Sequence, residues 1–179
     1  MISSVHERRV AQEWKLLLAL AAENPELLQD CVREDQLDGT VFRFRLLQTQ
    51  ALVEEAGQLQ ILDQHEVTLC FPRFFPSVPI EASLARPVFH PNVHPETGFV
   101  CLWSRFSSGD TVIEAVRQLQ KVISWELHNE EPDHVMQPKA LEIHTGENPC
   151  TSLTFTPLAI TLTSGFQLPQ GTGLRRRLQ

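Results

Sequence analysis

The chain has 179 residues, 42% of them hydrophobic, which is enough for one domain of ordinary size with a substantial buried core. It carries 15 basic and 22 acidic residues, a net charge of −7. This balance argues against nucleic acid as a partner, because nonspecific binding to nucleic acid depends on clustered Lys and Arg. No segment approaches the roughly 20 apolar residues that cross a bilayer, so we expect no membrane partner either.

The first predicted element is an amphipathic helix over residues 4–23. Its apolar side chains recur at the spacing of one helical face: Val10, Trp14, Leu17, Leu18 and Ala21. Pro25 has no backbone N–H and disfavours helical geometry in the residue before it. The helix should therefore end near Glu23.

A change of period predicts strands after residue 40. Residues 42–46 and 67–71 alternate apolar and polar side chains, as half-buried antiparallel strands do. A weaker alternation at 58–61, after Gly57, would lengthen the hairpin between them. Five prolines between positions 72 and 91 exclude a helix there and imply an irregular path.

Helical spacing returns at residues 112–123, and the preceding Thr111 with Glu114 forms the pattern of an N-terminal capping box. Residues 138–143 can add one short helical turn. The remainder is rich in Thr, Ser, Pro and Gly, and its alternating segments 153–155 and 160–162 suggest short edge strands.

Four cysteines lie far apart in the chain and form no C-x-x-C pair: Cys31, Cys70, Cys101 and Cys150. This spacing supports neither a zinc site nor a dithiol redox motif, so we expect no metal and no cofactor. A reducing, cytoplasmic environment fits best. We expect Cys31, Cys70 and Cys150 to be small buried hydrophobes.

Three motifs occur in a fixed order: FPRFFPSVP at 71–79, HPN at 90–92 and GFVCL at 98–102. Together they resemble the core of ubiquitin-conjugating enzymes. The resemblance implies an α+β fold with an N-terminal helix, an antiparallel meander of about four strands and a long central helix. It implies a catalytic core over residues 1–145. Residues 146–179 would form a Thr-rich extension, with short strands or disorder, in place of the family's usual last two helices.

The chemistry of these motifs also follows from the residues. A thiolate is a good nucleophile and a good leaving group, so Cys101 can accept an acyl group as a thioester and pass it on. The side-chain amide of Asn92 can donate a hydrogen bond to the oxyanion that forms during acyl transfer. We expect His90 and Pro91 to hold Asn92 in place, and the resemblance likewise makes the histidine structural and the asparagine catalytic.

The resemblance further implies an acidic residue, in the loop after the central helix, that steers the acceptor amine. In the sequence HNEEPDHVMQP, the acidic-acidic-Pro pattern points to Glu131, with Asp133 as the competitor. The motif does not decide which of Glu130, Glu131 and Asp133 acts on the acceptor. His128 and His134 lie in the same loop, and we expect both to be ordinary surface residues.

The resemblance implies three partners: a ubiquitin-like protein, its activating enzyme and a substrate protein with an acceptor amine. Arg8, Arg9 and Lys15 of the first helix would contact the activating enzyme. The usual anchors for a RING ligase are absent, because Ser77 replaces an aromatic residue and the loop SRFSSGDT lacks Ser-Pro-Ala. The shortened core resembles bacterial conjugating-enzyme-like proteins, some of which act in antiphage defence.

Two other functions remain open at the level of sequence. One is a noncatalytic module of the same fold that binds or scaffolds ubiquitin-like proteins, although such modules typically lack the cysteine. The other is an unrelated thiol hydrolase, which would need a histidine base and a third residue to orient it. The sequence places no such pair beside Cys101.

Overall fold

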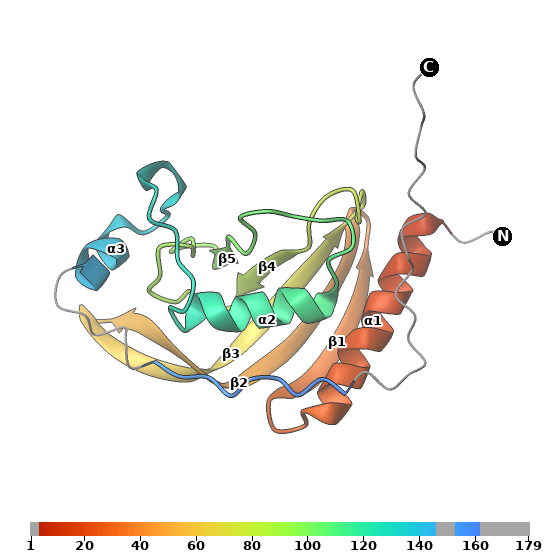
Figure 1. Ribbon diagram of the computed structural model, residues 1–179, viewed down its shortest axis with the longest axis horizontal. Coiled ribbons are helices and arrows are strands. Elements are labelled where there is room, and N and C mark those ends of the chain that lie inside the picture. Colours follow the sequence, from red (N-terminus) through yellow and green to blue (C-terminus); the bar gives the residue numbers. More distant parts are fainter. Residues whose placement is uncertain (1–3, 146–152, 162–179) are drawn as a thin grey trace, which may run out of the picture.

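The computed structural model describes residues 4–145 and 153–161, and it has one antiparallel sheet with helices on one side (Figure 1). The five strands pair in chain order: β1 (Leu28–Gln36), β2 (Gly39–Glu55), β3 (Gln58–Pro72), β4 (Glu81–Leu84) and β5 (Phe99–Val100). The helices are α1 (Val5–Glu23), α2 (Val112–Ile123) and α3 (Pro138–Thr145), and a 3-10 turn spans Pro132–His134. The predicted α+β meander is confirmed.

Helix α1 begins and ends where the sequence predicts. Ser4 caps its first turn in a capping box with Glu7, and the side chain of Asn24 donates to the Leu20 carbonyl at 2.8 Å where the helix ends. The buried face is rotated from the predicted one. Leu18 is exposed, whereas Leu16 and Leu20 are buried together with Leu17.

Strands β2 and β3 form one long hairpin that unites all three predicted strand segments. Glu55 pairs with Gln58, so the turn consists of Ala56 and Gly57, both of which have positive φ angles. The pairing of β2 with β3 is interrupted between Leu47 and Ala51, so residues 48–50 of β2 do not pair with β3. The hairpin carries the largest part of the sheet.

Three strands were not predicted, β1, β4 and the two-residue β5. β1 has only a weak alternation, because charged side chains such as Arg33 and Glu34 occupy most of its outer half. β4 lies inside the proline-rich segment and pairs with β3 through residues that avoid the prolines. The segment is free of helix, as predicted, but it is less irregular than predicted.

The core lies between the sheet, α1 and α2, and α2 crosses one face of the sheet (Figure 1). Phe42, Phe71 and Phe75 pack ring against ring at its centre, with centroids 4.3 and 5.1 Å apart. Each fully buried side chain of this size contributes about 1.5 to 3 kcal/mol. Thr111 and Glu114 form the predicted capping box at the start of α2.

Residues 153–161 run along the core (Figure 1, blue) rather than away from it. The backbone N–H of Gln50 donates to the Thr154 carbonyl and that of Thr156 to the Gln48 carbonyl, so this segment pairs with the part of β2 that leaves β3. Leu158 is buried in the core. The edge strand predicted at 153–155 is one isolated bridge between Thr49 and Phe155, and residues 160–161 of the other predicted strand are not in a strand. Residues 146–152 and 162–179 of the predicted extension lie outside the described residues.

No helix within residues 4–145 and 153–161 combines the length and apolar character needed to cross a membrane.

Candidate active site

Cys101 follows β5 directly and is half-buried. Its backbone N–H donates to the Asn92 carbonyl at 2.8 Å, so the cysteine is held against the HPN motif. The intervening residues 94–98 form a tight turn in which the N–H of Gly98 donates to the His94 carbonyl at 3.0 Å. Gly98 has φ +69° and passes so close to the Leu84 carbonyl that a Cβ atom would lie 2.0 Å from its oxygen. Only glycine fits this position.

His90 is fully buried and locks the turn that carries Asn92. Its Nδ1 accepts the backbone N–H of Asn92 at 3.0 Å, which requires a neutral ring with the proton on Nε2. Burial, followed by the nearby His128 and His144, lowers the pKa of His90 to about 3. The His90 ring is neutral and buried, and its Nδ1 already accepts a hydrogen bond. It can therefore hold the turn, but it has no free nitrogen lone pair with which to act as a base.

Asn92 connects two loops that are far apart in the sequence. Its Nδ2 donates to the Cys101 carbonyl at 3.0 Å, and its Oδ1 accepts the backbone N–H of Asn129 at 2.7 Å. Pro91 is buried beside it, and its carbonyl accepts the N–H of Met136. The side chain of Asn92 is therefore fixed between the cysteine and the loop after α2.

A cleft of about 520 Å³ opens beside Cys101. Trp103 and Ser104 line it from the same segment of chain, and Asn129, Glu130 and Glu131 line it from the loop after α2, with His128 and His134. The structure thus brings Glu130 and Glu131 to Cys101, while Asp133 is not among the lining residues. His134 is exposed, as expected from the sequence, whereas the side chain of His128 is largely enclosed. The only sequence signal that either lines the cleft was its position in the same loop as the acidic residues.

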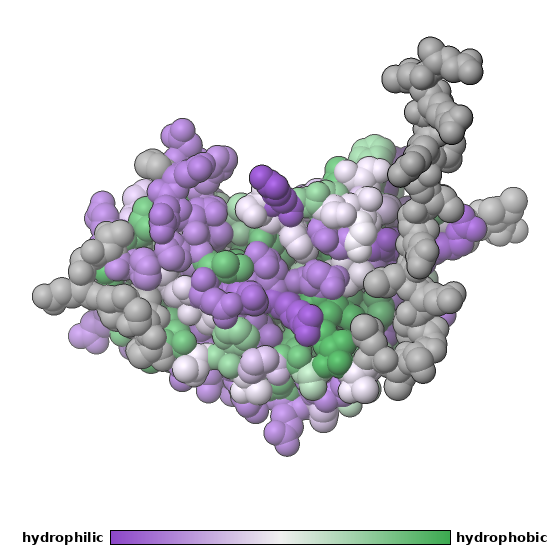
Figure 2. Space-filling view, in the orientation of Figure 1, coloured by the Kyte–Doolittle hydropathy of each residue, from purple (hydrophilic) through white to green (hydrophobic). Residues whose placement is uncertain are grey.

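Both histidines pair with the acidic residues of this cleft. Nε2 of His128 lies 3.3 Å from the Glu130 carboxylate, and Nε2 of His134 lies 3.6 Å from that of Glu131. The surface over α3 and the preceding loop is mostly hydrophilic (Figure 2, upper left). The acidic loop therefore presents a polar rim to the cleft.

A second hollow of about 640 Å³ adjoins the cleft, because Trp103 and Ser104 line both. Arg117 and Lys121 of α2 line it on one side and Leu158 on the other. The two hollows therefore lie side by side, and Cys101 lines the smaller one.

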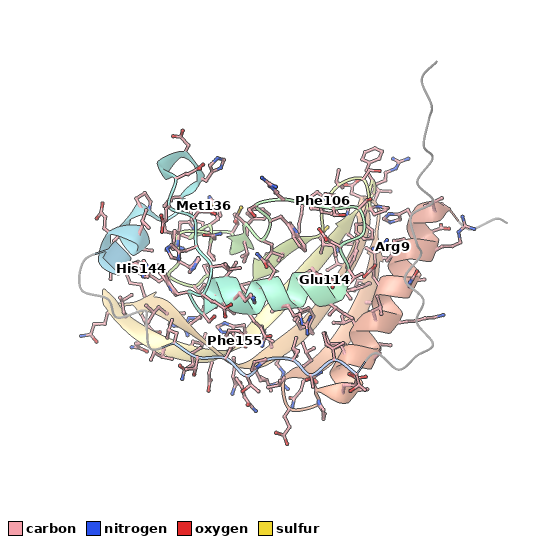
Figure 3. All side chains as sticks on the ribbon, in the orientation of Figure 1. Arg9, Phe106, Glu114, Met136, His144 and Phe155 are labelled. Atoms are coloured by element: carbon pink, nitrogen blue, oxygen red, sulfur yellow. The ribbon has the colours of Figure 1, made fainter. Side chains whose placement is uncertain are left out.

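The basic residues predicted to bind a partner are not equivalent. Arg8 and Lys15 are exposed on α1. Arg9 instead pairs with the buried Glu13 at 2.6 Å and donates to the carbonyls of residues 108–110 in the loop that it faces before α2 (Figure 3). Burial raises the pKa of Glu13, which also accepts the N–H of Val112. Arg9 therefore stabilises the junction of α1 and α2, a role that the sequence did not indicate.

The other described cysteines, Cys31 and Cys70, are free thiols on β1 and β3 and are half-buried rather than buried. Burial, followed by the neighbouring Asp30 and Glu81 respectively, raises the pKa of both thiols. A raised pKa keeps a thiol protonated and weakly nucleophilic. Cys150 lies outside the described residues.

Comparison with known proteins gives a match in structure alone. No family model matches the chain, and no curated protein matches it. A Plasmodium yoelii protein classed as a ubiquitin-conjugating enzyme superposes with a TM-score of 0.54 at 18% identity, covering 82% of this chain and 88% of that one. A Trypanosoma cruzi protein of the same class gives 0.53 at 16% identity, covering 82% and 92%. The chain therefore has the fold of the ubiquitin-conjugating enzymes.

Proposed function

We propose that the protein accepts a ubiquitin-like modifier from an activating enzyme as a thioester on Cys101 and transfers it to an amine. The observation that supports this most directly is the position of Cys101 at the cleft, with its carbonyl bound by the Asn92 amide at 3.0 Å. The fold shared with conjugating enzymes agrees with it. The adjoining hollow along α2 gives room for the C-terminal tail of the modifier.

Transfer follows the usual course of acyl substitution. The amine nitrogen attacks the thioester carbonyl carbon, an N–C bond forms, and the carbonyl electron pair moves to oxygen. A primary amide nitrogen carries two hydrogens, so Nδ2 of Asn92 has a hydrogen to donate to that oxyanion besides the one held by Cys101. The electron pair on the oxyanion then re-forms the carbonyl, the C–S bond breaks and Cys101 leaves as the thiolate, while the nitrogen loses its proton to water and an amide remains.

An acidic side chain of the loop after α2 would receive the acceptor. A lysine amine has a pKa of about 10.4 and arrives as an ammonium ion, which a carboxylate can bind and orient before the proton is lost. The motif does not separate Glu131 from Asp133, but Glu131 lines the cleft and Asp133 does not, which supports Glu131 of these two. The exposed Arg8 and Lys15 would contact the activating enzyme. A bacterial setting in antiphage defence stays a prediction from the sequence.

The test is loading with purified partners. With ATP, an activating enzyme and a ubiquitin-like protein, the wild-type chain should form an adduct on a nonreducing gel that thiol reagents remove. Cys101→Ser should lose the thiol-sensitive band, and the matched variant Cys70→Ser should keep it. If the wild-type chain forms no adduct, or Cys101→Ser keeps a reducible one, the protein is not a conjugating enzyme of this kind, and binding without an adduct would indicate a noncatalytic module.

A further inference from the structure

The ring of His128 is held in a cluster of aromatic side chains behind the cleft. The His144 ring, which projects from α3 (Figure 3), lies 4.5 Å from it, and the Trp125 ring lies 5.9 Å away. Trp125 in turn stacks on His144 and meets the edge of His90. The side chain of His128 is only 18% exposed. Its orientation is therefore set by packing.

This packing fixes which ring nitrogen faces the cleft. Nδ1 of His128 is buried without a hydrogen-bond partner among the described residues, and Nε2 points to the Glu130 carboxylate at 3.3 Å. A proton on Nδ1 would be buried and unpaired, so the favoured neutral form carries its proton on Nε2, the nitrogen that faces Glu130. The enclosed imidazole of His128 thus lies beside the carboxylate of Glu130 at the rim of the cleft.

The backbone of Glu130 is fixed as well. Asn92 accepts the N–H of Asn129, the residue before Glu130, and donates to the carbonyl of Cys101. Two hydrogen bonds therefore connect the cysteine to the residue adjacent to Glu130. This holds the backbone next to Glu130 close to the backbone of Cys101.

The side chain of Glu131 has a less enclosed partner. The two carboxylates are similarly exposed, Glu131 at 83% and Glu130 at 79%, but their partners differ. His134 is 67% exposed and lies 3.6 Å from Glu131, whereas His128 is only 18% exposed and lies 3.3 Å from Glu130. Ion pairs between exposed side chains hold their partners weakly, because water screens them and long side chains lose entropy when fixed. Glu131 lines the cleft but is not held over it.

We infer that Glu130 is the carboxylate that binds the acceptor's ammonium group, and that His128 is the residue that positions it. The inference rests on the proposed function and identifies two residues for its second step. Glu130 would contact the acceptor directly, whereas His128 acts through Glu130.

Two acceptors separate binding of an ammonium ion from general damage to the site. Free lysine is cationic at neutral pH, whereas hydroxylamine is an uncharged nucleophile. After Cys101 has been loaded, discharge would be followed in single turnover over a range of concentrations of each. Glu130→Gln and His128→Leu should each raise the half-saturating lysine concentration roughly three- to tenfold, with little change in discharge to hydroxylamine.

Matched variants test each part of the inference. His128→Gln keeps an N–H donor of similar reach and should restore lysine discharge to near the wild-type level. Glu126→Gln removes a carboxylate that pairs with Lys121 and does not line the cleft, and it should stay within about twofold of wild type. Equal loss with both acceptors, no rescue by His128→Gln, or a larger defect in Glu131→Gln than in Glu130→Gln would each overturn the inference. Failure of the wild-type chain to load would instead reject the proposed function, and this inference with it.

Discussion

At the scale of single residues, Asn92 combines a structural contact and a proposed catalytic one. Its oxygen accepts the Asn129 N–H, and its nitrogen donates to Cys101. Asn92→Ala removes both groups, whereas Asn92→Asp keeps an oxygen for Asn129 and loses the N–H donors. We expect both variants to load Cys101 and to discharge to lysine on the order of 100- to 1000-fold more slowly, the usual cost of losing one oxyanion donor. Single-turnover discharge measures this, and a wild-type rate in Asn92→Asp would remove the amide N–H from the mechanism.

At the scale of elements, α1 separates a proposed binding role from a structural one. Arg8 and Lys15 are seven residues apart, which places them on one helical face. Arg8→Glu/Lys15→Glu should slow loading by the activating enzyme at low salt and matter less as salt rises, because opposite charges act mainly on the association rate. Arg9→Ala should instead lower the free energy of unfolding by about 3 kcal/mol, since it leaves the buried Glu13 unpaired. Loading kinetics test the binding role of Arg8 and Lys15, and urea unfolding tests the structural role of Arg9. A wild-type loading rate in the double variant at low salt would contradict the binding role.

At the scale of the whole molecule, buried histidines couple folding to pH. The pKa of His90 is lowered to about 3, and burial also lowers the pKa of His65. Below pH 6.5 the unfolded chain therefore takes up protons that the folded chain excludes, so stability should fall as the pH falls from 6.5 towards 3. His90 alone accounts for on the order of 3 kcal/mol between pH 6.5 and 4. Urea midpoints should decline less steeply with falling pH in His90→Asn than in wild type, and parallel declines would refute this assignment.

The local elements could be predicted from the sequence because their determinants lie within a few residues of one another. Pro25 marks the end of α1, and the capping box of Thr111 and Glu114 marks the start of α2. The hydrogen bonds of this box join residues only three positions apart. The order of the three motifs likewise indicated the fold and pointed to Cys101 and Asn92. These parts of the description required no knowledge of how the elements pack.

Only the tertiary structure decided the contacts that join distant segments. Glu13 and Val112 meet across 99 residues, and Asn92 and Asn129 meet across 37. Such contacts determine that Arg9 is an internal residue, that Glu130 and Glu131 reach the cleft while Asp133 does not, and that His128 packs against His144. Periodicity could not reveal them, because it reports which face of an element is buried and carries no information about the partner that covers it.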